Sequence, residues 1–467
     1  MAAIDELMAL RSLPVPGKTE LIFSESDPVL ETNFKLAQTA SAALASVGVA
    51  INDLWELKTG RRQRIKIDAR AATAALRSKN YLQSRNAEGV FEDLTDPDHE
   101  ANRGLTGIYQ TKDGRWVLPH FGLDHLRGRM LNLLQAEANK WSVEKAVAKW
   151  NALELEGAMD EASVCGGMIR TNDEWLSEAH GKVLKAKPVV EIIKVGDSDP
   201  EPMPDGDRPL SGIRALDLTR ILAGPIAGRT LAEHGADVLM VTAPNLPQVW
   251  PYVVDTSHGK RSCFLDLHKD SEKRLMLDLV KRADVFTQGY RPDKINQLGF
   301  GPEKLMKVRP GLVYVSISCY GSDGPFSHRA GWEQIAQIMT GLAAEGIQTS
   351  SEYKPKTLPA AANDYITGYL GAYGTLLALA RRAREGGSYH VRVSLCQTAM
   401  MIYREGKIMN LPEDLRLNLA EINALRVETK SHLGDIRHLA PVLDLSITQP
   451  YWALPTPELG SSKPIWV

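Results

Sequence analysis

The sequence predicts an α/β fold in which a mainly parallel, Rossmann-like sheet is flanked by helices. Four short segments rich in Val, Ile and Leu are bounded by turn signals, as strands buried on both faces usually are. They cover residues 213–218, 236–241, 284–288 and 312–318, and a further candidate covers 262–267. Helical patterns fill the gaps between them, and this alternation favours a parallel sheet.

The helices between these strands are indicated by their ends and by their spacing. Residues 226–234 stop at Gly235, a residue favoured just beyond a helix C-terminus. Residues 271–283 repeat apolar side chains at helical spacing, and residues 331–342 place them at i, i+3, i+4 and i+7. Each of these helices follows a predicted strand, as a parallel sheet requires.

The loops that follow the strands indicate where a ligand binds. In open parallel sheets, ligands bind outside the carboxyl ends of the strands. The loops expected there are TRILAGP at 219–225, YRPDK at 290–294 and CYGSDGP at 319–325. Neither a G-x-G-x-x-G nor a P-loop motif follows the first strand, which disfavours a dinucleotide or P-loop site. The sequence therefore predicts a different ligand at this edge.

Composition limits the classes of function. The chain has 467 residues, enough for two or three domains, and a net charge of −2 that argues against nucleic-acid binding. A local basic pocket for a phosphorylated ligand is still compatible with this charge. Four scattered cysteines without C-x-x-C spacing indicate free thiols, and no metal-ligand cluster is evident. With no signal peptide and no membrane-length apolar segment, we expect a soluble cytoplasmic protein.

Six sequence blocks follow one another in the order and at the spacing of a known family. They read PLSGIRALDLTRILAGP, LAEHGADVLMV, GKRSCFLDL, ADVFTQGYRPDKINQLGFGPEKL, LVYVSISCYGSDGP and AGWEQIAQIMTGL. These blocks resemble the class III CoA-transferase family, also called CaiB/BaiF, which includes the α-methylacyl-CoA racemases. The resemblance implies a Rossmann-like large domain, a smaller α+β domain and coenzyme A as the ligand, with no metal.

The resemblance also implies an unusual domain order. GIYQTKDGRWV at 107–117 and VCGGMIRTNDEWL at 164–176 resemble the family's smaller domain, which here precedes the large one. The segment 196–208 is rich in Pro, Gly and acidic residues and is the expected linker. We therefore expect an N-terminal helical segment at 1–103, a small α+β domain at 104–195, the linker at 196–208, a CoA-binding large domain at 209–410 and a tail at 411–467.

An internal repeat offers an explanation for this order. Residues 38–76 align without gaps on residues 364–402 at a constant shift of 326, and Gly48 falls on Gly374. Three identities support the alignment. It predicts that the first half begins midway through one family unit and that the second half supplies a new Rossmann-like portion. The alternative is two unrelated amphipathic helices, each followed by a strand.

The resemblance implies that Glu333 is the catalytic carboxylate. In the family, a carboxylate at this point of a G-x-D motif attacks the acyl-CoA thioester, and the resulting mixed anhydride is converted to an enzyme–CoA thioester. Glu333 also falls in the first turn of the helix predicted at 331–342, where the helix dipole favours an ionised carboxylate. The family has Asp here, so the added methylene displaces the attacking oxygen. A glutamate that merely favours a first helical turn is the alternative.

Asp364 is the second catalytic candidate. The racemase branch uses a His immediately before the motif acid and an Asp on the following helix; here Trp332 stands at the His position and Asp364 is kept. Racemisation needs a proton acceptor on each face, so Trp332 argues against an ordinary racemase but not against one-base isomerisation or elimination. A helix N-cap is the alternative role for Asp364.

The resemblance further implies which residues bind CoA. It points to Arg291 in GYRPD, to Lys260 and Arg261 in HGKRS, and to the loop that contains Ala223. Guanidinium and ammonium groups can neutralise the phosphates of the nucleotide, although each alone is more often a solvated surface charge. For His120, Asp124 and His125 of the small domain we expect a structural role.

The sequence therefore predicts an enzyme that handles acyl-CoA, transferring CoA between carboxylic acids with Glu333 as nucleophile. One alternative is a racemase, isomerase or lyase that acts at the α or β carbon of an acyl substrate. The other is a binding protein that has lost catalysis, because Glu333, Trp332 and Thr242 all depart from the family. Family members form interlocked dimers, so a homodimer is expected.

Overall fold

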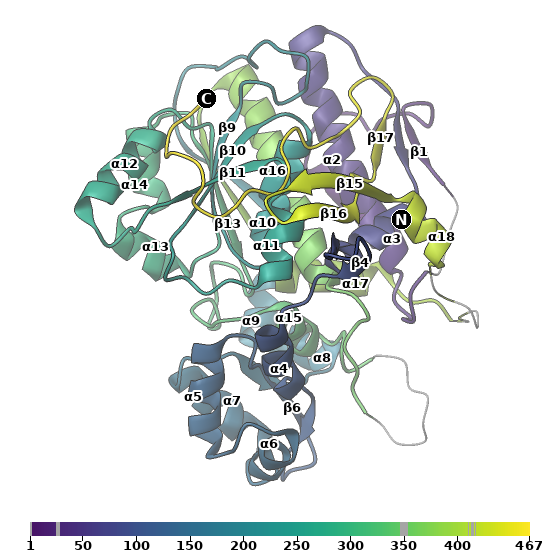
Figure 1. Ribbon diagram of the computed structural model, residues 1–467, viewed down its shortest axis with the longest axis vertical. Coiled ribbons are helices and arrows are strands. Elements are labelled where there is room, and N and C mark those ends of the chain that lie inside the picture. The colour runs from purple at the N-terminus through teal and green to yellow at the C-terminus, as the bar shows by residue number, and fades with distance from the viewer. Residues whose placement is uncertain (1, 25–28, 346–353, 410, 412–414, 416) are drawn as a thin grey trace.

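The computed structural model describes the chain except residues 1, 25–28, 346–353, 410, 412–414 and 416. A large α/β body lies above a smaller domain in the view of Figure 1. None of the described helices is long and apolar enough to cross a membrane.

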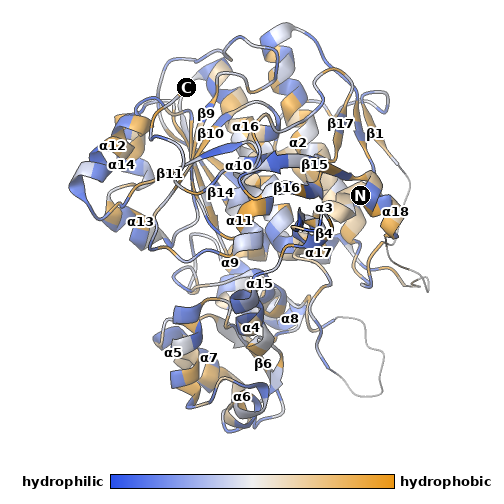
Figure 2. Cartoon of the chain, in the orientation of Figure 1, coloured by the Kyte–Doolittle hydropathy of each residue, from blue (hydrophilic) through white to orange (hydrophobic). Residues whose placement is uncertain are grey.

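A seven-stranded sheet forms the centre of the large body. Its order is β11-β10-β9-β12-β13-β14-β8, and all neighbouring strands are parallel except β14 and β8. The strands are β8 (Val190–Gly196), β9 (Arg214–Leu218), β10 (Asp237–Thr242), β11 (Lys260–Phe264), β12 (Val285–Gln288), β13 (Val313–Ser318) and β14 (Ser388–Ser394). The predicted parallel, Rossmann-like sheet is confirmed, and Figure 2 shows its strands mostly in hydrophobic colours.

Helices cover both faces of this sheet, as burial of its strands on both sides requires. One face carries α12, α13 and α14, whose apolar side chains share a core with β9 and β10. The other carries α10 and α16, which belong to the larger core. The helices are α10 (Ala223–Glu233), α11 (Trp250–Thr256), α12 (Asp270–Val280), α13 (Pro292–Leu298), α14 (Pro302–Val308), α15 (Glu333–Thr340), α16 (Ala362–Glu385) and α17 (Leu395–Glu405).

The N-terminal region forms a second, much smaller sheet against the same core. Its strands β1 (Leu21–Phe23), β2 (Ile65–Ile67) and β17 (Leu443–Leu445) occur in the order β1-β2-β17. The connecting helix α2 (Leu36–Thr59) packs against α16, and both are buried over most of their length. Further helical elements of this region are α1 (Ala2–Ala9), α3 (Ala69–Ala75), η1 (Ser78–Tyr81) and α4 (Pro97–Leu105).

The small domain combines an antiparallel sheet with short helices and has its own apolar core. Its sheet is β5-β6-β7, with β5 (Tyr109–Gln110), β6 (Trp116–Pro119) and β7 (Gly166–Met168). Its helices are α5 (Asp124–Leu134), α6 (Lys140–Val147), α7 (Ala152–Glu161), α8 (Asn172–Ser177) and α9 (Ala179–Lys185). The boundary expected at residue 195 cuts through β8, because this strand leaves the small domain and pairs with β14 of the large sheet.

The segment expected to be a tail at 411–467 contributes strands to two sheets. The strands β15 (Arg426–Ser431) and β16 (Gly434–Leu439) join β3 (Gln83–Arg85) and β4 (Phe91–Asp93), while β17 joins β2; α18 (Leu419–Ala424) precedes them. The last residues then run along β11, where the Ser462 N–H donates to the Ser262 carbonyl at 2.7 Å.

Candidate active site

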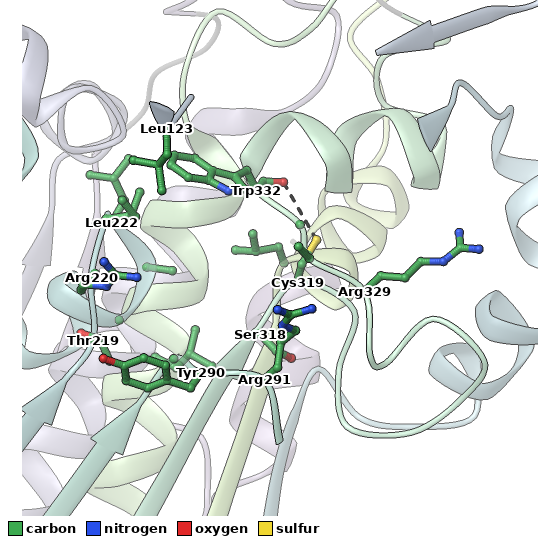
Figure 3. Close-up of a pocket in the computed structure, with 18 of the residues that line it drawn as sticks. Leu123, Thr219, Arg220, Leu222, Tyr290, Arg291, Ser318, Cys319, Arg329 and Trp332 are labelled. Atoms are coloured by element: carbon green, nitrogen blue, oxygen red, sulfur yellow. Dashed lines mark hydrogen bonds between the residues drawn. The ribbon is translucent and has the colours of Figure 1, made fainter. Parts of the chain in front are cut away.

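A cavity of about 420 Å³ opens at the carboxyl ends of the parallel strands. Residues 219–224 after β9, residues 289–294 after β12 and residues 317–319 at the end of β13 contribute to its wall. The loops that the sequence predicted to converge there are thus found together. Helix α5 of the small domain completes the wall, and Figure 3 shows the labelled lining residues.

The loop after β9 brings the main chain close to the cavity. Ile221 has a φ of 75°, which is rare for a β-branched residue, and α10 begins two residues later at Ala223. A side chain at Gly224 would collide with that of Thr219. The close approach of Thr219 explains the glycine at 224, and the turn brings Ala223 to the cavity wall.

Glu333 lies at the first position of α15 and is 4% exposed. Its carboxylate accepts hydrogen bonds from Gln337 Nε2 at 2.6 Å and from Asn363 Nδ2 at 3.0 Å. It also accepts from the backbone N–H groups of Asn363 at 3.2 Å and Asp364 at 2.7 Å, in the first turn of α16. Glu333 itself is not among the residues that line the cavity, whereas its neighbours Trp332 and Asp364 are.

Glu333 and Asp364 form a buried pair of carboxylates. Burial raises the pKa of Glu333 to about 7, although its four donors pull in the opposite direction. Burial, followed by the charge of Glu333, raises the pKa of Asp364 well above its ordinary value. Two carboxylates this close do not both ionise easily, so the pair tends to hold one proton at neutral pH. Among the described residues that line the cavity, Asp364 carries the sole carboxylate.

Trp332 occupies the place where the racemase branch has a histidine. Its ring lies against that of His120, with 4.7 Å between the ring centroids. Burial lowers the pKa of His120 to about 4, so this imidazole is neutral at pH 7. The structural role expected for His120 agrees with this packing, since the ring supports Trp332 from the small-domain side.

Basic side chains gather around the cavity. Arg291 lines it as predicted, together with Lys294 of the same loop and Arg220 of the loop after β9. The small domain adds His125 and Arg129, both on α5 and both exposed. Arg220 and Lys294 lie within loops that the sequence marked. His125 was expected to be structural and Arg129 was not singled out, because no local pattern reveals that α5 reaches the sheet edge.

Lys260 and Arg261 do not line the cavity. Lys260 is 1% exposed, and its ammonium bonds Asp217 Oδ2 at 2.7 Å and the Pro225 carbonyl at 2.8 Å beneath the start of α10. Arg261 forms a double hydrogen bond with Asp237. Both lie on β11 at the sheet edge, where adjacent side chains point to opposite faces of the sheet.

Comparison with known proteins places these features in context. A family model described as CoA-transferase family III matches residues 3–200 and 210–413. An acetyl-coenzyme A transferase, nodX of Hypoxylon pulicicidum, is 30% identical over 409 residues, which cover 79% of this chain and 69% of that protein. The succinyl-CoA:glutarate CoA-transferase of Mus musculus is 35% identical over 205 residues, which cover 41% of this chain and 46% of that protein.

A solved structure is also similar in part. The crystal structure of Rv3272 from M. tuberculosis, in an orthorhombic form, shares 32% sequence identity with this chain. The match covers 42% of this chain and 57% of that one, with a TM-score of 0.40.

Proposed function

Since this chain belongs to CoA-transferase family III, we propose that it transfers CoA between carboxylic acids through a covalent intermediate on Glu333. The substrates are then an acyl-CoA and a free carboxylic acid. The observation that carries the proposal is a carboxylate with a pKa near 7, held immediately behind the wall of a cation-rich cavity.

In the proposed reaction, a carboxylate oxygen of Glu333 attacks the thioester carbonyl carbon, the carbon–sulfur bond breaks and CoA leaves as a thiolate. The thiolate then attacks the glutamyl carbonyl, releasing the first acid and leaving CoA on Glu333. The second acid reverses both steps and departs as its CoA thioester. Each step exchanges one acyl bond for another, so no oxidant or additional reactant is needed.

The position of Glu333 sets one requirement for this reaction. Its oxygens are engaged by the first turn of α16 rather than directed into the cavity. The side chain has to turn past Asp364 to meet a thioester. Loss of the four hydrogen bonds on turning leaves a more nucleophilic carboxylate.

The experiment that tests the proposal is adduct trapping. The purified protein is incubated with several CoA thioesters, and peptides containing Glu333 are examined by mass spectrometry with and without hydroxylamine. We expect a CoA or acyl adduct on Glu333 that hydroxylamine removes, no adduct in Glu333→Gln, and retention or increase in Glu333→Asp. Glu303→Gln is the matched control, because Glu303 also lies in the first turn of a helix but away from the cavity. An adduct that survives in Glu333→Gln would refute the assignment.

A second candidate function is proton exchange at the acyl α carbon, with Asp364 as the base. The observation that favours it is that Asp364 faces the cavity while Glu333 does not. Incorporation of solvent deuterium at the α carbon, without acyl exchange between acids, would support this function over transfer. Binding of CoA with neither reaction would instead indicate a protein that has lost catalysis.

We also propose a cytoplasmic location and a homodimer. The location is supported by the four cysteines, all of which are free thiols. The homodimer is supported by the resemblance alone. Cell fractionation and light scattering of the purified protein test these two proposals.

A further inference from the structure

Helix α5 presents two basic residues to the cavity from the small domain. His125 and Arg129 are four residues apart and therefore lie on the same side of the helix. Both line the cavity, together with the buried Leu126 between them. The neighbouring Arg127 is absent from the cavity wall and donates to Asn102 Oδ1 at 3.0 Å instead.

The two residues on α5 face a third basic residue across the cavity. Burial, and then the positive charges of Arg129 and Arg220, lower the pKa of His125, which indicates that the three groups lie within electrostatic reach of one another. Arg220 follows β9 in the large domain, so the cluster spans two domains. Asp124 is also near His125, and it accepts a hydrogen bond from Asn102 Nδ2 at 2.7 Å.

The two arginines of this cluster are not paired with carboxylates in the described parts of the chain. Within the described parts of the chain, Arg129 forms no ion pair, and Arg220 donates to a carbonyl oxygen, that of Pro247, at 2.9 Å. Arg329 of the same cavity differs, because it pairs with Asp160 at 3.0 Å and Glu156 at 3.2 Å. Guanidinium groups without carboxylate partners repel one another, and an anionic ligand relieves that repulsion.

We propose that His125, Arg129 and Arg220 form a phosphate subsite for CoA, through which the ligand joins the small domain to the large sheet. The inference rests on the proposed function and deepens it. A monocarboxylic acid offers one carboxylate, which a single arginine can bind, whereas CoA carries a diphosphate and a 3′-phosphate. Guanidinium groups bind such oxygens through paired, charge-assisted hydrogen bonds.

Calorimetry with CoA on the full chain tests the subsite. We expect Arg129→Ala to weaken CoA binding by about 10-fold or more, because charge-assisted hydrogen bonds to phosphate are lost. Arg129→Lys should recover part of the affinity, and Arg127→Ala, on the same helix, should bind like the unchanged protein. The affinity of Arg129→Ala for CoA should also fall less steeply with salt concentration.

Dephospho-CoA, which lacks the 3′-phosphate, identifies the phosphate that is bound. If Arg129→Ala weakens the binding of dephospho-CoA as much as that of CoA, the subsite binds the diphosphate. If Arg129→Ala leaves the binding of dephospho-CoA unchanged, the subsite binds the 3′-phosphate.

Three results would overturn the inference. The first is equal CoA affinity in Arg129→Ala and the unchanged protein. The second is a rise in KM for the acceptor acid with unchanged CoA affinity, which would assign Arg129 to the carboxylate. Both leave the proposed function standing. The third, no CoA binding by the unchanged protein, removes the proposed function together with this subsite.

Discussion

The two sheets that flank the α2–α16 pair are unequal copies of one arrangement. In both, a parallel neighbour lies on one side of a central strand and an antiparallel neighbour on the other. In the large sheet these are β13, β14 and β8, and in the small sheet β1, β2 and β17. The central residue Ile65 pairs with Leu21 and Leu445, and its counterpart Val391 pairs with Val315 and Ile192.

A pair of glycines shows the same correspondence in the packing of the helices. A Cβ on Gly374 of α16 would lie 2.6 Å from Val391 Cγ1 and 2.8 Å from Val190 Cγ1. A Cβ on Gly48 of α2 would lie 2.8 Å from Ile65 Cγ2 and 3.6 Å from Leu443 Cδ2. Each helix thus approaches its central strand and the antiparallel neighbour through a glycine, as the shift of 326 residues predicts.

The two copies share the arrangement of a helix on three strands but differ in the size of the sheet and in the residue at the position of Asp364. Among the described residues the small sheet has three strands, and the position equivalent to Asp364 is Gln38. The antiparallel strands are exchanged: β8 precedes the linker but joins the large sheet, and β17 follows the large domain but joins the small one. We therefore expect the first region to serve as a support and the second to carry the chemistry.

The largest expected effect is on turnover, when Asp364 and the equivalent residue Gln38 are each substituted. Asp364→Asn should lower turnover by about 100-fold or more, because it removes a cavity carboxylate and alters the proton shared with Glu333. Gln38→Asn should change turnover by less than about twofold, as a partly exposed residue away from the cavity. Steady-state kinetics measure both; equal losses would contradict the assignment of the chemistry to one region.

The two glycines should differ in their effect on stability. Gly374→Ala is expected to lower the free energy of unfolding by about 2–3 kcal/mol, since both of its near contacts lie closer than a Cβ tolerates. Gly48→Ala should cost less, about 1–2 kcal/mol, because it has one such contact. Urea unfolding measures both values. A neutral Gly374→Ala would show that α16 does not need this close approach.

We expect the second region, which contains Glu333, to give the protein a pH-dependent stability. Burial raises the pKa of Glu333 from 4.5 to about 7, so between these values the folded protein holds a proton that the unfolded chain has lost. The stability from this proton is complete below about pH 4.5 and is lost as the pH rises through 7. Glu333→Gln should therefore flatten the stability curve between pH 4.5 and 7, by roughly 1–3 kcal/mol. An unchanged curve would contradict the raised pKa.

The smallest expected effect concerns mixing two impaired variants, which should not restore activity. Glu333→Gln impairs the large domain, and Arg129→Glu impairs the small domain that covers the same cavity. Because one chain supplies both parts, the mixed proteins should show only the sum of their separate activities. Recovery after mixing would mean that domains are shared between chains.

The sequence revealed the parts of this structure that have local signals. Five strands of the seven-stranded sheet were predicted from short apolar segments between turn residues, and Glu333 begins a helix with clear apolar spacing. Strands β1, β2 and β17 have three residues each, too few for any periodicity. The burial of Lys260 depends on Asp217, which is far away in the chain, and the presence of Arg129 in the cavity wall depends on where α5 packs; no local pattern specifies either.

The chain that runs along β11 has a consequence for how the molecule behaves in solution. Strand β11 ends the large sheet, and an uncovered terminal strand readily recruits a strand from a neighbouring molecule. Here the C-terminal segment covers this edge strand. The Ser462 N–H donates to the Ser262 carbonyl, and the Arg261 side chain donates to the Ile465 carbonyl. We therefore expect proteolytic cleavage near residue 455 to cause concentration-dependent self-association. The cleavage would remove none of the residues that line the cavity.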